Sequence, residues 1–110
     1  MKKNELLKDL KSFLEPHPIF EGSDEDIYSV RKDLKIKLWI DRGFIFDLYP
    51  LNYEINFNII KTGILIIADR NNGSVLRILT KNIIGFELIR ESDFKGDLNA
   101  LFALKDHQKN

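Results

Sequence analysis

The sequence predicts an α+β fold in which an N-terminal helix and a C-terminal helix flank an antiparallel meander of six or seven strands. Three observations favour this fold class. Apolar residues recur at helical spacing at both ends of the chain, they alternate with polar residues between positions 27 and 90, and tight turns separate the alternating segments. Because consecutive hairpins imply a meander and amphipathic helices need an apolar surface to cover, we expect a curved sheet or partly closed barrel with both helices packed on it.

The composition indicates one globular domain over residues 1–110. The chain is 44% hydrophobic and 31% charged, and it is long enough to bury a core without disulfides or metal. Seventeen Lys and Arg balance seventeen Asp and Glu, which disfavours generic nucleic-acid binding because there is no net positive charge. Cysteine is absent, which excludes thiol catalysis, disulfides and thiolate zinc sites.

The first helix is predicted over residues 4–15. Its apolar face carries five side chains: Leu6, Leu7, Leu10, Phe13 and Leu14. Pro16 and Pro18 end the helix, because proline lacks the amide donor and biases the preceding residue toward extended conformations. We therefore expect an extended connector over residues 16–20, followed by a solvated acidic loop over residues 21–26.

Three strands are predicted next, over residues 34–40, 44–49 and 53–60. In each segment, apolar side chains recur at every second position, as in a strand with one buried face, and most of the intervening side chains are polar or aromatic. The turn at residues 41–43 joins the first two strands as a hairpin, and Pro50 breaks the second strand.

Residues 64–68 are apolar at every position, which predicts a central strand covered on both faces. Asn72-Gly73 predicts a tight hairpin to a strand over residues 75–80, because both residues tolerate positive φ. A further strand follows over residues 83–90. The C-terminal helix is predicted from four apolar residues at helical spacing: Phe94, Leu98, Leu101 and Phe102.

The residue types that most often carry catalysis are few or isolated. His17 lies between two prolines and His107 lies in a charged tail, so we expect both to be solvated surface residues without an orienting partner. Neither belongs to a motif with metal-ligand spacing, and the isolated glycines form no phosphate-binding loop. The sequence therefore assigns no catalytic residue, no metal site and no cofactor.

Carboxylates remain as possible catalytic groups. Four of them lie on or beside strands: Asp41, Asp47, Glu54 and Asp69. If the second and third strands pair around Pro50, Asp47 and Glu54 lie nearly opposite each other. A small carboxylate-dependent hydrolase or nuclease is therefore one alternative function, weighed against an ordinary solvated sheet face.

Candidate partner-binding residues lie in the acidic loop and on the polar faces of the first two strands. Residues 21–26 sum to a charge of −4 and residues 31–37 to +3, so the balanced total hides local differences. Aromatic residues on a polar sheet face are favoured interface anchors, although a covering helix would make Trp39 part of the core. The candidates are Asp24, Glu25, Asp26, Lys35, Lys37, Trp39, Asp47 and Tyr49.

These observations favour a non-enzymatic protein-binding module. Fifteen Ile against two Val, and twelve Lys against five Arg, suggest an AT-rich bacterial genome. Small α+β chains of that origin without a catalytic constellation include immunity proteins that neutralise toxins, and we expect an inhibitor of this kind with another protein as its partner. The chain shows neither a signal peptide nor a membrane span, so we expect a cytoplasmic protein. Homo-oligomers are possible because an uncovered sheet edge invites pairing.

The strand meander followed by a C-terminal helix resembles the layout of pleckstrin-homology-like barrels, and the stretch 63–90 is similar to their later strands. The resemblance is one of topology and carries over no binding residue. It implies a second alternative, a barrel that binds an anionic ligand or peptide. The basic candidates for that function are Lys35, Lys37, Arg70, Arg77 and Lys81.

Overall fold

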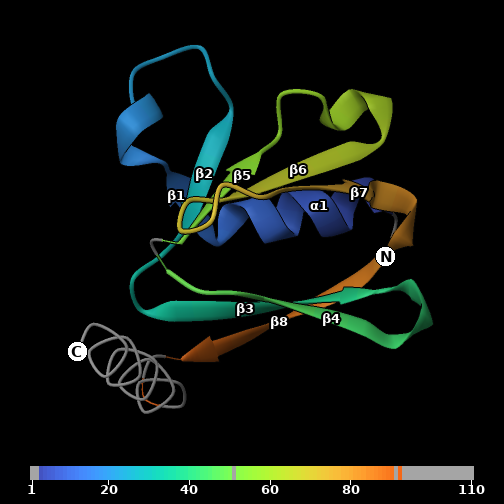
Figure 1. The fold of residues 1–110 in the computed structure, drawn as a ribbon. Helices are drawn as coiled ribbons and strands as arrows, with labels where there is room; N and C mark the ends of the chain where they lie inside the picture. Colours follow the sequence, from blue (N-terminus) through green and yellow to red (C-terminus); the bar gives the residue numbers. More distant parts are fainter. Residues whose placement is uncertain (1–2, 51, 91, 93–110) are drawn as a thin grey trace.

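The computed structural model describes residues 3–50, 52–90 and 92, and it arranges them as a helix and two antiparallel sheets (Figure 1). Helix α1 spans Lys3–Ser12. The strands are β1 (Leu14–Pro16), β2 (Ile27–Val30), β3 (Leu34–Ile40), β4 (Phe44–Leu48), β5 (Tyr53–Asn56), β6 (Ile64–Asp69), β7 (Val75–Leu79) and β8 (Ile83–Arg90). Four short 3₁₀ helices join them: η1 (Pro18–Phe20), η2 (Asp41–Gly43), η3 (Ile60–Thr62) and η4 (Thr80–Asn82).

The strands form a five-stranded sheet in the order β1-β2-β5-β6-β7 and a three-stranded sheet in the order β4-β3-β8. The predicted helix at the N-terminus, the antiparallel strands and the hairpins β3–β4 and β6–β7 are confirmed. A single curved sheet or partly closed barrel is wrong, because the chain crosses between the sheets after β2, β4 and β7. The predicted C-terminal helix lies outside the described residues.

Helix α1 is shorter than predicted, because the extended backbone associated with Pro16 begins before the proline itself. The helix ends at Ser12, and residues 14–16 form β1, which pairs with β2. Proline disfavours helical backbone at the residue before it, so residue 15 is already extended. The predicted extended connector over residues 16–20 is also partly wrong: it contains η1, whose first turn is capped by the His17 ring accepting a hydrogen bond from the Ile19 amide at 3.2 Å.

Strand β5 ends at Asn56, four residues earlier than predicted. The Asn56 side chain accepts a hydrogen bond from the backbone amide of Asn58 at 2.8 Å, which turns the chain out of the sheet. The apolar residues that follow Asn56 therefore pack at the end of the sheet instead of extending the strand.

Strand β6 lies between β5 and β7, as predicted for a central strand, but only one of its faces is fully buried. Leu65 and Ile67 are at most 1% exposed, whereas the alternating residues Ile64, Ile66 and Ala68 are half-buried. The prediction that this strand is covered on both faces is therefore wrong for the described part of the chain. One apolar face of β6 packs in the core and the other lies on the outside of the sheet.

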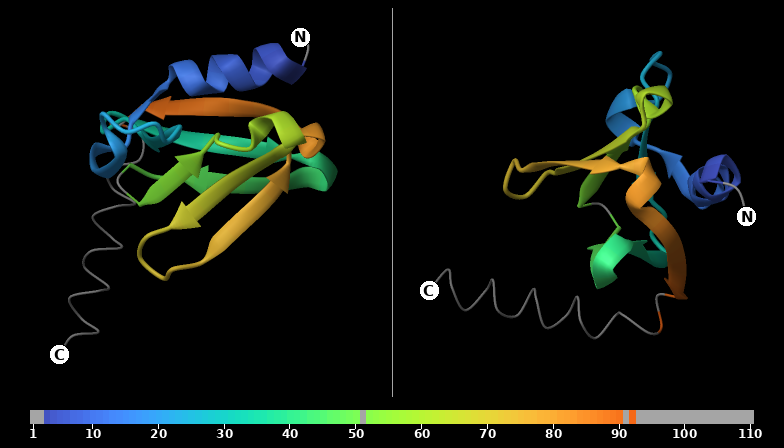
Figure 2. Two further views of the ribbon diagram at one scale, coloured as in Figure 1. Left: turned by 90° about the horizontal axis from the view of Figure 1, so that it is seen from above. Right: turned by 90° about the vertical axis from the view of Figure 1, so that its right-hand side faces the viewer.

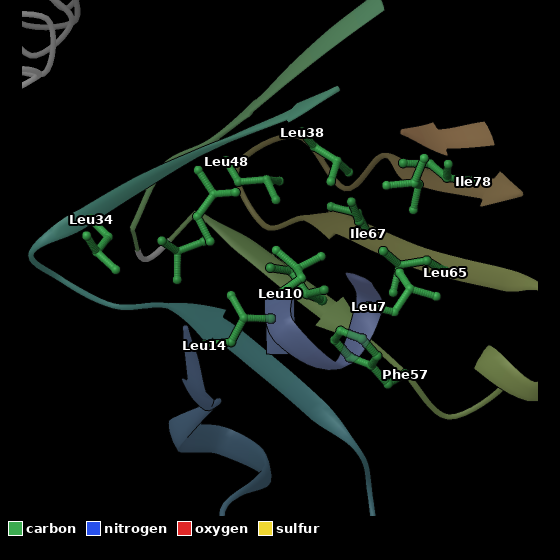
Figure 3. Close-up of a cluster of buried hydrophobic side chains, with 14 residues drawn as sticks. Leu7, Leu10, Leu14, Leu34, Leu38, Leu48, Phe57, Leu65, Ile67 and Ile78 are labelled. Carbon is green, nitrogen blue, oxygen red and sulfur yellow. The ribbon is translucent and has the colours of Figure 1, made fainter. Parts of the chain in front are cut away.

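The core fills the space between the two sheets and beneath α1. Figure 3 shows side chains from α1 and from both sheets pointing toward one another. Leu10 of α1, Leu38 of β3 and Ile67 of β6 are each buried to 1% exposure or less. Helix α1 lies beside β8, on the opposite side of the molecule from β7 (Figure 2), and the rings of Phe13 and Phe86 meet there at 6.0 Å. The helix thus closes one side of the sandwich.

Candidate functional site

The outer face of the three-stranded sheet, called here the polar face, carries five of the predicted partner-binding residues: Lys35, Lys37, Trp39, Asp47 and Tyr49. The register places Lys37 between Asp47 of β4 and Glu87 of β8. Trp39 lies opposite Ile45 of β4. Alternation along the strands is a local property, so the sequence was sufficient to place these side chains on one face.

Much of the polar face is occupied by contacts within the chain. The Lys35 ammonium lies 3.3 Å from the Tyr49 hydroxyl and 4.8 Å from the centroid of the Tyr49 ring. Lys35 is only 6% exposed, and Trp39 is half-buried. A lysine that is buried against an aromatic ring contributes to packing and has little surface left for a partner.

Asp47 does not meet Glu54. Strands β4 and β5 belong to different sheets, so the expected pairing of these carboxylates is wrong. One carboxylate oxygen of Asp47, Oδ1, is buried without a hydrogen-bond partner among the described residues. Burial, with the nearby charge of Asp69, raises the pKa of the Tyr53 hydroxyl. Over the described ranges, no group of three or more acidic or histidine side chains could hold a metal ion.

The acidic loop immediately precedes β2 of the five-stranded sheet, and the structure does not join it to the polar face. The Glu25 carboxylate accepts a hydrogen bond from the Asn58 amide group, and Asp26 pairs with Lys11 at 2.9 Å. Asp24 is exposed. The predicted solvated loop is therefore anchored at its end to α1 and to the segment after β5.

Lys11 connects α1 to this loop. Its ammonium lies 4.9 Å from the Tyr28 ring centroid and 5.2 Å from that of Phe57. Partial burial of Asp26 favours its neutral form, but hydrogen bonds from Tyr28 and Lys11 outweigh this and lower its pKa. Burial likewise opposes the charge of Lys11, but its bonds to Asp26 and Tyr28 raise its pKa. The pKa of Tyr28 is raised mainly by its hydrogen bond to Asp26 and to a smaller extent by burial.

His17 is not the solvated residue that the sequence suggested. The residue is 5% exposed, its ring lies tilted at 60° to that of Phe20 with the centroids 5.6 Å apart, and its Nε2 lies 3.3 Å from the Arg70 guanidinium. Arg70 also lies 3.6 Å from a carboxylate oxygen of Glu54. Proline on either side of His17 suggested an exposed connector, but η1 folds the chain over the ring. His107 lies outside the described residues.

The basic residues proposed for a pleckstrin-like anion site do not converge. Lys35 and Lys37 lie on the three-stranded sheet, whereas Arg77 lies on β7 in the other sheet. Arg70 follows β6, where it contacts His17 and Glu54, and Lys81 lies in η4. These basic groups are therefore dispersed over several elements of the two sheets.

A groove of about 520 Å³ opens between β4 and β7, each of which is an edge strand of its sheet. Its lining is mostly apolar and includes exposed side chains from both strands. Phe44 is 67% exposed and Ile45 46% on β4, and Leu76 is 38% exposed and Leu79 46% on β7. Exposed large apolar residues gathered along one groove are characteristic of binding surfaces.

The outer face of the β6–β7 hairpin continues the apolar surface around the edge of the sheet. The register places Ala68 opposite Val75 and Ile64 opposite Leu79, with Arg77 between them on β7. Val75 is 49% exposed. Strand β7 therefore has apolar side chains on both of its faces at the open edge of a sheet.

The backbone of β7 directs hydrogen-bonding groups toward this open edge. The Asp69 amide donates to the Ser74 carbonyl, and the Thr80 amide donates to the Gly63 carbonyl, both at 2.9 Å. In an antiparallel ladder, alternate residues point both backbone groups toward the same neighbouring strand. Because the backbone groups of Ser74 and Thr80 point toward the β6 side, those of Leu76 and Ile78 do so as well. The backbone groups of Val75, Arg77 and Leu79 point away from β6, toward the open edge.

Sequence reasoning did not identify this site, although two signals for it were present. Residues 64–68 and 75–76 are apolar on both faces of their strands, and Phe44-Ile45-Phe46 is continuously apolar. These runs indicate a second apolar face, but they do not show whether that face packs in the core or binds a partner. In the structure, β7 lies at the edge of its sheet.

No protein-family model, curated protein or solved structure matches this chain. The helix in the described part of the chain is too short to span a membrane. A function for the chain therefore has to be argued from the geometry of its surface.

Proposed function

We propose that this chain is a non-enzymatic protein-binding module that accepts an extended segment of another protein as an added strand on β7. The observation that carries the proposal is the set of outward-pointing backbone groups of Val75, Arg77 and Leu79, flanked by apolar side chains on both faces of the strand. Strand addition to an exposed edge takes affinity from main-chain hydrogen bonds and specificity from pockets for alternate side chains.

The groove beside β4 supplies the second element of such a site. A strand added to β7 directs every second side chain toward the core side of the sheet, where the groove holds Phe44, Leu76 and Ile78. Burial of these surfaces stabilises the complex by roughly 25 cal/mol per Å² of apolar area, before the cost of ordering the partner segment. The edge and the groove thus act on the same ligand.

Within this class we retain an inhibitor or immunity role, in which binding alone neutralises a partner protein such as a toxin. Strand addition requires no chemistry from this chain, which suits that role. A cytoplasmic location is part of the same proposal, and the absence of cysteine is compatible with it.

The proposal is tested by selecting peptides from a random display library on the whole chain and mapping each binder by amide NMR. The blocking variant is Val75→Lys combined with Leu79→Lys, which places two charges on the outer edge of β7. Both side chains are about half exposed, so the fold tolerates the change. The matched control is Ile84→Lys, which alters an isoleucine that is 59% exposed on β8.

We expect selected peptides to bind the wild-type chain and the Ile84→Lys variant but not the double variant. Binding should slow hydrogen exchange of the amides of Val75, Arg77 and Leu79, which point away from β6 in the free chain. Peptides that bind the double variant as well as wild type, or that protect none of these amides, contradict strand addition at β7.

A further inference from the structure

We infer that the strand accepted by β7 carries an acidic side chain opposite Arg77, with apolar side chains two positions away on either side. This inference rests on the proposed function and defines the chemistry of its partner. It follows from the surroundings of Arg77, from the distribution of charge around β7, and from the apolar groove beneath the strand.

Arg77 lies at the centre of the open edge, on the outer face of the sheet. Its neighbour on β6 is Ile66, and the residues two positions away on its own strand are Val75 and Leu79. The guanidinium is exposed and makes no side-chain hydrogen bond or ion pair with the residues that the structure describes. An added strand would place its own side chain directly beside Arg77, and a carboxylate there would form a charge-assisted pair.

Charged residues along the chain from position 70 to position 86 have one sign, whereas Asp69, which ends β6, lies beside the residue that precedes β7. All charged residues between positions 70 and 86 are basic: Arg70, Arg77 and Lys81. Arg70 is already close to Glu54, at 3.6 Å, and Lys81 lies just beyond the end of the strand. This arrangement attracts an acidic segment and repels a basic one, so charge selects among extended peptides that have similar apolar content.

The remaining positions of the partner follow from the alternation of side chains. On the outer face, the partner residues two positions before and after the acid lie beside Val75 and Leu79, so apolar side chains fit there. On the inner face, the intervening residues meet the groove with Phe44 and Leu76. The segment therefore reads apolar, apolar, acidic, apolar, apolar. This pattern is symmetric, so it suits either strand direction.

A second copy of this chain that pairs through its own β7 fits the edge less well than such a segment. Two antiparallel β7 strands, in the register centred on Arg77, place the two guanidinium groups opposite each other. Registers shifted by one pair place Arg77 opposite Val75 or Leu79 instead. No register of β7 on itself supplies an acid, because residues 75–79 contain none. Charge complementarity therefore disfavours a symmetric dimer formed by pairing β7 with β7.

Three synthetic peptides test the inference on the whole chain. Each has the central sequence Val-Leu-X-Leu-Val between polar flanks, with X as Glu, Gln or Lys. Affinity is measured by titration, and the amides of Val75, Arg77 and Leu79 report where each peptide binds. An exposed charge pair is worth up to about fivefold in affinity, so we expect the Glu peptide to bind several times more tightly than the Gln peptide and the Lys peptide to bind worst.

Charge reversal supplies the decisive variant. In Arg77→Glu, the order of the three peptides should invert, with the Lys peptide binding best. The matched control is Arg31→Gln, which removes an exposed arginine in the turn between β2 and β3 and should leave the order unchanged.

The outcomes separate the two proposals. Equal affinities for the three peptides, with shifts at the β7 amides, overturn the acidic residue and leave strand addition intact. No shift at these amides with any peptide overturns both. A concentration-dependent dimer in sedimentation that Val75→Lys with Leu79→Lys abolishes identifies a second copy as the occupant and overturns the inference.

Discussion

The two sides of the sandwich differ in what covers them. On one side, α1 packs beside β8, buries Leu10 to 1% exposure and is fixed to the loop before β2 by Lys11 and Asp26. On the other side, β4 and β7 face a groove in which side chains as large as Phe44 stay 67% exposed. A small domain that closes one side with its own helix and leaves the other apolar has a surface ready for a partner.

The closed side combines apolar burial with a polar anchor, whereas the open side has apolar contacts without an anchoring ion pair for Arg77 among the described residues. This difference separates residues that hold the fold from residues available for binding. Stability should therefore depend strongly on α1 and weakly on the exposed side chains of β7.

The largest effect is expected from Leu10→Ala on the closed side. Removing a buried leucine leaves a cavity and costs about 2–5 kcal/mol of unfolding free energy. The matched change on the open side, Leu79→Ala, removes a side chain that is 46% exposed and should stay within about 0.5 kcal/mol of wild type. Urea unfolding of both variants measures the contrast. Similar losses would show that the exposed side of β7 contributes to the fold as much as α1 does.

A smaller effect is expected in the hairpin that carries β7. Gly73 has a φ of +75°, so Gly73→Ala forces a side chain into left-handed backbone and costs about 1 kcal/mol. Gly85 on β8 has no atom within 4 Å of an added Cβ and no positive φ. Gly85→Ala should therefore leave the unfolding free energy unchanged or raise it by about 0.5 kcal/mol. Equal losses in thermal or urea unfolding would contradict this dependence on the turn.

Local features of the fold were predictable from the sequence, and long-range ones were not. Alternation placed Lys37 and Trp39 on one face because side chains alternate along any strand. Asn72-Gly73 identified the β6–β7 hairpin because that dipeptide suits a tight turn. The pairing of β3 with β8 joins residues far apart in the sequence, and alternation gives the same pattern whichever strand is the neighbour. The two-sheet arrangement therefore could not be derived.

The candidate site was harder to predict than the fold. The polar face was found from alternation, but Lys35 is buried against Tyr49, which the pattern of charges could not show. The edge of β7 went unnoticed because the edge of a sheet is a property of topology. The apolar second face of β6 was visible in the sequence, but whether that face is buried depends on which elements cover the sheet.

The smallest effect is expected from the anchor of the closed side, through its dependence on pH. The pKa of Asp26 lies below its ordinary value of 3.8, so its stabilising contribution is present above about pH 4 and is lost as pH falls through the lowered pKa. The pKa of Lys11 lies above 10.5, so its contribution is present below that pH and is lost as pH rises through the raised pKa. Both side chains are about one-third exposed, which limits the pair to about 1 kcal/mol or less.

Asp26→Asn isolates this anchor, because asparagine keeps the shape of the side chain without the charge. Compared with wild type, the variant should be less stable at neutral pH by up to about 1 kcal/mol, and the difference should disappear as pH falls through the lowered pKa of Asp26. Asp24→Asn is the matched control, since Asp24 is an exposed acid in the same loop, and it should change stability little at either pH. An Asp26→Asn difference that persists in acid would show that the anchor acts through shape and hydrogen bonding, so that charge would no longer distinguish the closed side from the open one.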